Sequence, residues 1–183
     1  MTLGVECIIL LADIVLFSAY LVAVLVRFGI PVNLSMTYYM YRQKNEVLRL
    51  LFPCLLIFLC ASCGPLWINI SYKSEWATLF VALSYITIVC LVAVAASAQY
   101  QKTQAIIYFH YTCAIIASAC TTLWLLLLSY KVMHIALGIL LISICLGIIT
   151  KTLKSCTLFW LEIAGFYALM ITLLIIYFVP IQL

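Results

Sequence analysis

Six apolar segments, each long enough to cross a lipid bilayer, fill almost the whole of the 183-residue chain and are joined by short connectors. A spanning helix needs roughly 20 apolar residues, because each residue adds about 1.5 Å along the axis and the hydrocarbon layer is about 30 Å thick. All six segments meet that length. They cover residues 5–28, 47–71, 77–99, 105–129, 132–150 and 157–180.

Composition independently excludes a water-soluble fold. Hydrophobic residues make up 69% of the chain and charged residues only 8%, and the mean hydropathy is +1.32, whereas about a quarter of the residues of a soluble domain are charged. A transmembrane β-barrel alternates apolar and polar residues, but positions such as 123–128 are apolar without interruption. Because the bilayer offers the backbone no hydrogen bonds, we expect an all-α polytopic bundle of six helices in one transmembrane domain, 1–183.

The nine basic residues are unevenly divided between the two ends of the predicted bundle. Short cytoplasmic connectors of membrane proteins are enriched in Lys and Arg. We therefore expect the connectors after the first, third and fifth helices to face the cytoplasm, and both termini to lie outside it. This topology accounts for the net charge of +4, so nucleic-acid binding is not indicated. The basic residues on the predicted cytoplasmic side are Arg27, Arg42, Lys44, Arg49, Lys102, Lys151 and Lys154, against Lys73 and Lys131 on the other.

The connectors leave no room for a separate soluble domain, since the longest covers only about residues 29–46. No glycine-rich phosphate loop, zinc-ligand spacing or nucleophile elbow occurs in the sequence, so no catalytic residue, metal site or cofactor is predicted. The nine cysteines lie within or beside apolar segments, where we expect them to pack as small hydrophobic side chains. Unpaired thiols beside lipid are compatible with a bacterial inner membrane.

Ionisable side chains at membrane depth are the main candidates for function, because a charge there is costly unless it is paired or neutralised. His110 lies about five residues, or roughly 8 Å, inside the predicted cytoplasmic end of 105–129, and Glu162 lies at the same depth in 157–180. We therefore expect these two side chains to meet. Asp13 is expected about eight residues inside the opposite face, close to Ser62, either in a structural role or along an ion path.

The predicted contact between His110 and Glu162 has two interpretations. It is a proton-handling or ligand-coordinating pair, or it is a polar clamp that holds one helix against the other. From His110, small or polar residues recur every four positions at Ala114, Ser118 and Thr122. This stripe predicts that the helix 105–129 turns that face inward and lies at the centre of the bundle.

The first connector is unusually rich in residues that cap helices or lie at a membrane interface. Pro31 ends the first helix, and Ser35 and Thr37 can hydrogen-bond nearby backbone. Tyr38 and Tyr39 suit the headgroup region, because their rings are apolar and their hydroxyls are wet. Two roles remain open for this connector, a lid over the cavity that holds His110 and Glu162, or simple interfacial anchoring.

Three groups of residues carry a resemblance to known membrane proteins. They are Ile30-Pro31 with residues 34–39, His110-Tyr111 with Ala114 and Trp124, and Glu162 with Phe166. Together they resemble uncharacterised small six-helix membrane proteins of gut Bacteroidetes and their mobile elements. The chain is more remotely similar to the DRAM (damage-regulated autophagy modulator) type, although Met36 replaces the acid of its Ile-Ser-Asp-Thr loop and the charge bias puts this loop on the opposite side. The resemblance implies the six-helix arrangement and no activity.

These observations favour a non-enzymatic membrane module with a polar site near the cytoplasmic face. Such a module binds a lipid or small apolar ligand, or passes protons or small solutes along Asp13, His110 and Glu162. The alternatives are an intramembrane enzyme that uses His110 and Glu162 on a lipid-borne substrate, or a structural subunit of a membrane complex. The oligomeric state is open, and assembly as a homo-oligomer or within a larger complex is compatible with the sequence.

Overall fold

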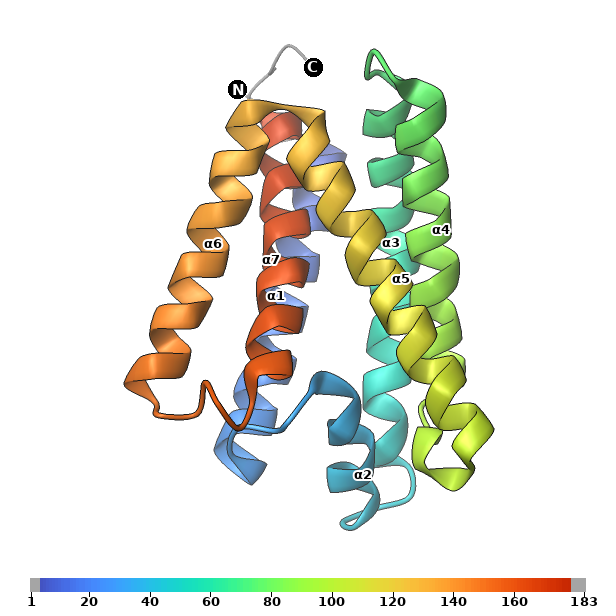
Figure 1. The fold of residues 1–183 in the computed structure, drawn as a ribbon, viewed down its shortest axis with the longest axis vertical. Coiled ribbons are helices and arrows are strands. Elements are labelled where there is room, and N and C mark those ends of the chain that lie inside the picture. The colour runs from blue at the N-terminus through green and yellow to red at the C-terminus, as the bar shows by residue number, and fades with distance from the viewer. Residues whose placement is uncertain (1–3, 179–183) are drawn as a thin grey trace.

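The computed structural model describes residues 4–178, and within them the chain is α-helical with no β-strand. Six of the helices are long and apolar enough to cross a membrane, so the protein is an integral membrane protein with an all-α polytopic fold. Figure 1 shows these helices running roughly along one direction as a bundle. They are α1 (Val5–Phe28), α3 (Leu51–Tyr72), α4 (Ala77–Ala96), α5 (Gln104–Leu128), α6 (Tyr130–Ile149) and α7 (Thr157–Phe178).

The helix boundaries agree with the predicted ones to within a few residues. The largest differences are at the start of α3, which begins at Leu51 instead of the predicted position 47, and at the end of α4, which stops at Ala96 instead of the predicted position 99. Ser97 follows with a non-helical backbone (φ −95°, ψ 26°), and its hydroxyl donates to the Ala93 carbonyl at 2.7 Å. The predicted extension of the last helix to Pro180 lies outside the described residues.

The long helices expose apolar side chains outward as well as burying them. Val15 of α1, Val89 of α4 and Leu141 of α6 are all exposed. In water such a surface would aggregate, whereas in a bilayer it is solvated by lipid chains. The exposed apolar surface is therefore what a protein surrounded by lipid chains requires.

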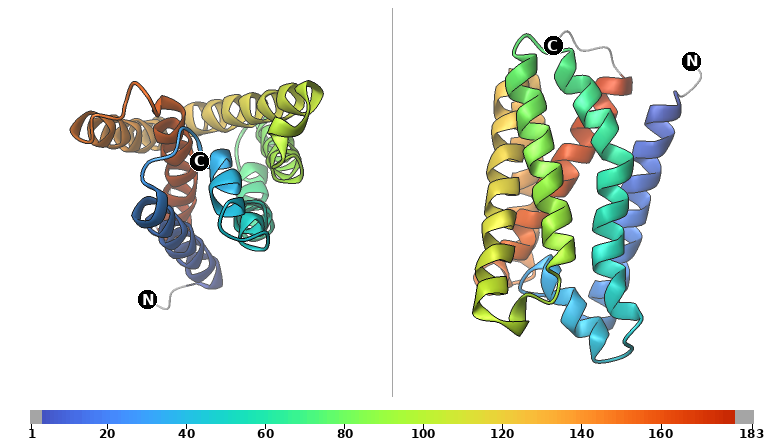
Figure 2. Two further views of the ribbon diagram at one scale, coloured as in Figure 1. Left: turned by 90° about the horizontal axis from the view of Figure 1, so that it is seen from below. Right: turned by 90° about the vertical axis from the view of Figure 1, so that its right-hand side faces the viewer.

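The most buried helix is α7, which corrects the prediction that 105–129 occupies the centre. In the most apolar stretch of α7, 50% of the residues are buried, compared with 33% in α5 and 17% in α6. Figures 1 and 2 show why: α5 packs along α4 on one side of the bundle, whereas α7 runs between α1, α5 and α6. The helices α5 and α6 meet at the turn around Ser129 and diverge towards their other ends.

The first connector folds back across one end of the bundle. Gly29 closes α1 with a positive φ of 77°, a conformation that favours glycine. Asn33 then caps the 3₁₀ turn η1 (Leu34–Met36), because its Oδ1 accepts from the Met36 N–H at 2.8 Å. The short helix α2 (Thr37–Arg42) follows, and Figure 2 shows it lying across this end between α1, α7 and α3.

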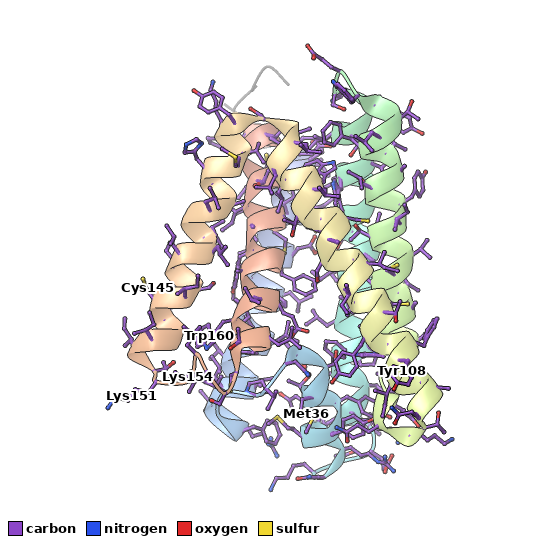
Figure 3. The ribbon with its side chains drawn as sticks, in the orientation of Figure 1. Met36, Tyr108, Cys145, Lys151, Lys154 and Trp160 are labelled. Carbon is purple, nitrogen blue, oxygen red and sulfur yellow. The ribbon has the colours of Figure 1, made fainter. Side chains whose placement is uncertain are left out.

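The connectors α1–α3, α4–α5 and α6–α7 lie at the same end of the molecule, which we call the basic end. Figure 3 shows Met36 of the first connector and Lys151 and Lys154 of the α6–α7 connector at this end. The first connector is tied to the start of α7, where the Phe159 N–H donates to the Val32 carbonyl at 3.1 Å. The polar loops at the basic end are therefore part of the packed bundle.

Candidate functional site

A cavity of about 640 Å³ lies between α5, α6 and α7 and reaches the first connector at the basic end. This volume is within the range of about 300–1,000 Å³ that small-molecule sites occupy. Its walls are mainly apolar and include Leu125, Leu140 and Leu169. Its polar members are Asn33, Ser35, His110, Ser118, Thr121, Thr122 and Glu162.

The cavity opens sideways, through the outer surface of the bundle. Several of its lining side chains are also exposed, among them Ile115 (68%), Leu161 (47%) and Leu137 (43%). These three residues belong to α5, α7 and α6, and Figure 1 shows α5 and α6 diverging towards the basic end with α7 between them. These lining residues lie on membrane-length helices, so in a bilayer their exposed side chains contact lipid chains.

His110 is held at the polar end of the cavity by two hydroxyl groups. Its Nδ1 lies 3.0 Å from Ser97 Oγ, and its Nε2 lies 2.9 Å from Ser35 Oγ. With the Ser97 hydroxyl donating its proton to Ala93 O, we assign to His110 the neutral tautomer that carries its proton on Nδ1, and Ser97 Oγ accepts that proton. Nε2 is then an acceptor, and the Ser35 hydroxyl donates to it. The contact between His110 and Ser35 joins α5 to the turn η1.

Glu162 reaches the same turn from α7. Its Oε2 accepts from the Leu34 N–H at 2.6 Å, so neighbouring residues of η1 are held by α5 on one side and α7 on the other. No ion pair joins His110 to Glu162 within the described part of the chain, which corrects the predicted direct contact. Both side chains are at the predicted end and line one cavity, but the first connector lies between their hydrogen-bonding groups.

The remaining candidates in the first connector have different positions. Thr37 is fully buried, and its hydroxyl donates to Leu34 O at 2.6 Å and pairs with the Tyr20 hydroxyl. Tyr39 accepts from the Gln101 N–H at 2.7 Å, and partial burial raises the pKa of its hydroxyl above the usual value. Tyr38 is buried beside Tyr39, with ring centroids 5.2 Å apart. Of the four candidates in this connector, only Ser35 lines the cavity.

Asp13 belongs to a separate polar cluster between α1 and α3. The Ser62 hydroxyl donates to its Oδ1 and the Cys63 thiol to its Oδ2, each at 2.9 Å. The predicted neighbour Ser62 is thus in place. Asp13 is buried and does not line the cavity, so the structure does not join it to His110 and Glu162.

Sequence reasoning missed two residues of the polar end. Ser97 was assigned to the interior of a membrane helix, and only the early end of α4 brings its hydroxyl to His110. Asn33 also lines the cavity, and its place in the cavity wall follows from the fold of the connector. The stripe of Ala114, Ser118 and Thr122 lines the cavity, but Ser118 and Thr122 are exposed, so this face of α5 is not packed inside the bundle as predicted.

Comparisons of the chain with profiles of known protein families, with curated proteins and with solved structures found no match.

Proposed function

We propose that the protein is a non-enzymatic membrane module that binds a lipid or another small apolar molecule in the cavity between α5, α6 and α7. The observation that carries this function is the combination of a cavity of about 640 Å³, mainly apolar walls and a polar cluster at one end. Small-molecule sites typically have this composition, in which the apolar walls supply affinity and a few polar groups set orientation. The sideways opening supports entry from the hydrocarbon layer.

Passage of protons or solutes along Asp13, His110 and Glu162 is less well supported. Such a path needs these side chains to line one continuous channel. Asp13 is instead occupied by Ser62 and Cys63 and does not line the cavity. This arrangement therefore favours binding of a ligand in the cavity over passage of protons or solutes through the protein.

Two glycines provide a matched test of binding. A Cβ at Gly165, which lines the cavity, or at Gly138, which does not, meets no atom within 4 Å. Gly165→Leu should therefore fill the cavity without a clash, whereas Gly138→Leu should leave it open. The probe is a long alkyl chain with a photoreactive diazirine, added to the full-length protein in lipid nanodiscs, and labelled peptides are mapped by mass spectrometry.

We expect the wild-type protein and Gly138→Leu to be labelled at cavity residues of α5 and α7, and Gly165→Leu to lose that labelling. Labelling of the outward face of α4, around Val89, should be equal in all three proteins, because ordinary membrane lipid reaches it. Cavity labelling that persists in Gly165→Leu, or that never occurs in the wild type, would exclude the binding function.

One observation favours an enzyme as the second candidate. The Ser35 hydroxyl donates to His110 Nε2 at 2.9 Å, and Ser97 orients the other ring nitrogen, which is the arrangement of an activated nucleophile and its base. On a lipid ester, Ser35 Oγ would attack the carbonyl carbon while His110 takes the proton. The ester C–O bond would break, the alcohol would leave with that proton, and water would hydrolyse the acyl-serine. A fluorophosphonate probe that labels the wild type and not Ser35→Ala would support this activity, and absence of labelling would exclude it.

We also propose that the basic end faces the cytoplasm of a bacterial inner membrane, with both termini outside. The excess of Lys and Arg at this end supports the orientation. Lys44→Cys should react with a membrane-impermeant maleimide only after the cells are permeabilised, whereas Lys73→Cys should react in intact cells. The reverse pattern would invert the topology.

A further inference from the structure

We propose that the cavity selects amphiphiles whose polar end is a hydroxyl group, with long-chain alcohols as the simplest members of the class. This specificity rests on the binding function proposed above and adds the chemistry of the headgroup. It follows from the hydrogen-bonding capacity left unused at the polar end of the cavity, where η1, α5 and α7 come together.

Ser35 offers a hydrogen-bond acceptor to the cavity. In the tautomer of His110 assigned above, with its proton on Nδ1 towards Ser97, the Ser35 hydroxyl donates its own proton to His110 Nε2. The lone pairs of Ser35 Oγ remain available, and the side chain lines the cavity. A ligand placed there gains most by donating a hydrogen bond to this oxygen.

Glu162 and Asn33 complete the polar end with complementary groups. Glu162 uses Oε2 to accept from Leu34, and its Oε1 has no hydrogen-bond partner among the side chains and backbone that the structure describes. Asn33 uses Oδ1 to cap η1, and its Nδ2 is likewise without a described partner. The residues that line the cavity therefore carry one unused amide donor, one unused carboxyl oxygen and one serine oxygen.

A hydroxyl group matches this set better than other common lipid headgroups. A hydroxyl both donates a hydrogen bond, which Ser35 Oγ and Glu162 Oε1 can accept, and accepts one, which Asn33 Nδ2 can donate. A primary ammonium only donates and leaves the amide donor unused, and a carboxylate only accepts and meets the carboxyl group of Glu162. A hydroxyl also suits Glu162 in either protonation state, because it can donate to a carboxylate or accept from a carboxylic acid. An alkane satisfies none of these groups.

The test is a competition experiment with the photoreactive alkyl probe and the full-length protein in nanodiscs. Unlabelled long-chain alcohol, primary amine, carboxylic acid and alkane of equal chain length are added, and loss of cavity labelling is measured. We expect the alcohol to compete about tenfold more effectively than the alkane, since it gains up to two hydrogen bonds. The amine and the acid should compete less well than the alcohol.

Two variants link this preference to named atoms. Asn33→Asp keeps the oxygen that caps η1 but replaces the amide donor by a second acceptor, so it should shift the preference from the alcohol towards the amine. Ser35→Ala removes the serine oxygen and should reduce the advantage of the alcohol over the alkane. Ser155→Ala, in the exposed α6–α7 connector outside the cavity, is the matched control and should leave the order unchanged.

The outcomes separate headgroup selection from binding itself. If the alkyl probe labels the wild-type cavity but all four competitors act equally, or the acid acts best, hydroxyl selection is wrong and the binding function stands. The same conclusion holds if the alcohol is preferred equally in Asn33→Asp and the wild type. If the probe does not label the cavity at all, the binding function fails first.

Discussion

The imidazole Nε2 of His110 lies 2.9 Å from the hydroxyl oxygen of Ser35, across a separation of 75 residues in the chain. One partner is on a membrane-length helix and the other is in a 3₁₀ turn of the first connector. Both side chains are buried. The hydrogen bond therefore holds the connector against the bundle at the polar end of the cavity.

This contact should be visible as an energetic coupling. In a double-mutant cycle of His110→Ala and Ser35→Ala, measured by denaturant titration in mild detergent, we expect a coupling free energy of about 1 kcal/mol. Each single variant leaves one buried polar group without its partner, and the double variant removes both. The pair His110→Ala and Ser155→Ala is the control and should be additive. Additivity of His110 and Ser35 would show that the hydrogen bond does not form.

Glu162 should restrain the first connector through the Leu34 N–H. Glu162→Leu removes the acceptor, so we expect local opening of the connector and roughly tenfold faster tryptic cleavage after Arg42 and Lys44, both exposed. Glu162→Gln retains a side-chain oxygen at the same position and should be cleaved almost as slowly as the wild type. Equal cleavage rates for all three proteins would contradict this role of Glu162.

Gly147 should be required where α6 packs on the start of α7. A Cβ at this position would lie 2.9 Å from Leu153 Cδ1 and 3.1 Å from Trp160 Cδ1, and the Trp160 ring is held because its Nε1–H donates to Thr152 Oγ1 at 3.1 Å. Gly147→Ala is therefore expected to lower the free energy of unfolding by about 1–3 kcal/mol.

Gly138→Ala on the same helix provides the comparison, since a Cβ there meets no atom within 4 Å. It should be neutral or stabilising by up to about 1 kcal/mol, because alanine favours the helix. Unfolding of both variants is followed by circular dichroism in detergent. A Gly147→Ala protein as stable as Gly138→Ala would mean that α6 is not packed closely at this point.

Asp13 should contribute to stability as a clamp between α1 and α3. Asp13→Ala removes the acceptor for both the Ser62 hydroxyl and the Cys63 thiol, and we expect it to cost about 1–3 kcal/mol in unfolding free energy. Asp13→Asn keeps one oxygen and should cost less. Thermal unfolding measures both variants, and equal stability of wild type and Asp13→Ala would rule out the clamp.

The all-α membrane fold was predictable because it depends on properties that each segment carries alone. A run of apolar residues longer than the bilayer is thick must form a helix, whatever its neighbours do. Small departures came from local contacts: α4 ends early at Ala96, where Ser97 turns its hydroxyl towards the preceding carbonyls and His110.

The site was predictable only in part. Depth along a helix follows from residue number, and His110 and Glu162 do lie at the same end and line one cavity. Which group each one contacts depends on how the helices are turned and how far apart they stand. The connector residues Leu34 and Ser35 occupy the space between them, and no periodicity in the sequence encodes that insertion.

The amino-acid sequence alone determined that this chain is a membrane protein, how many times it can cross the bilayer, and which ionisable groups lie at membrane depth. These properties depend on the hydrophobic length and the axial rise of each segment, which do not depend on the other segments. Only the tertiary structure decided that α5 and α6 diverge to leave a cavity, that α7 and not α5 is the most buried helix, and that Ser35 reaches His110. Those features arise from packing between segments that are far apart in the chain. Many arrangements of the helices would bury similar apolar surface, and small differences in side-chain volume and hydrogen-bond direction select one of them.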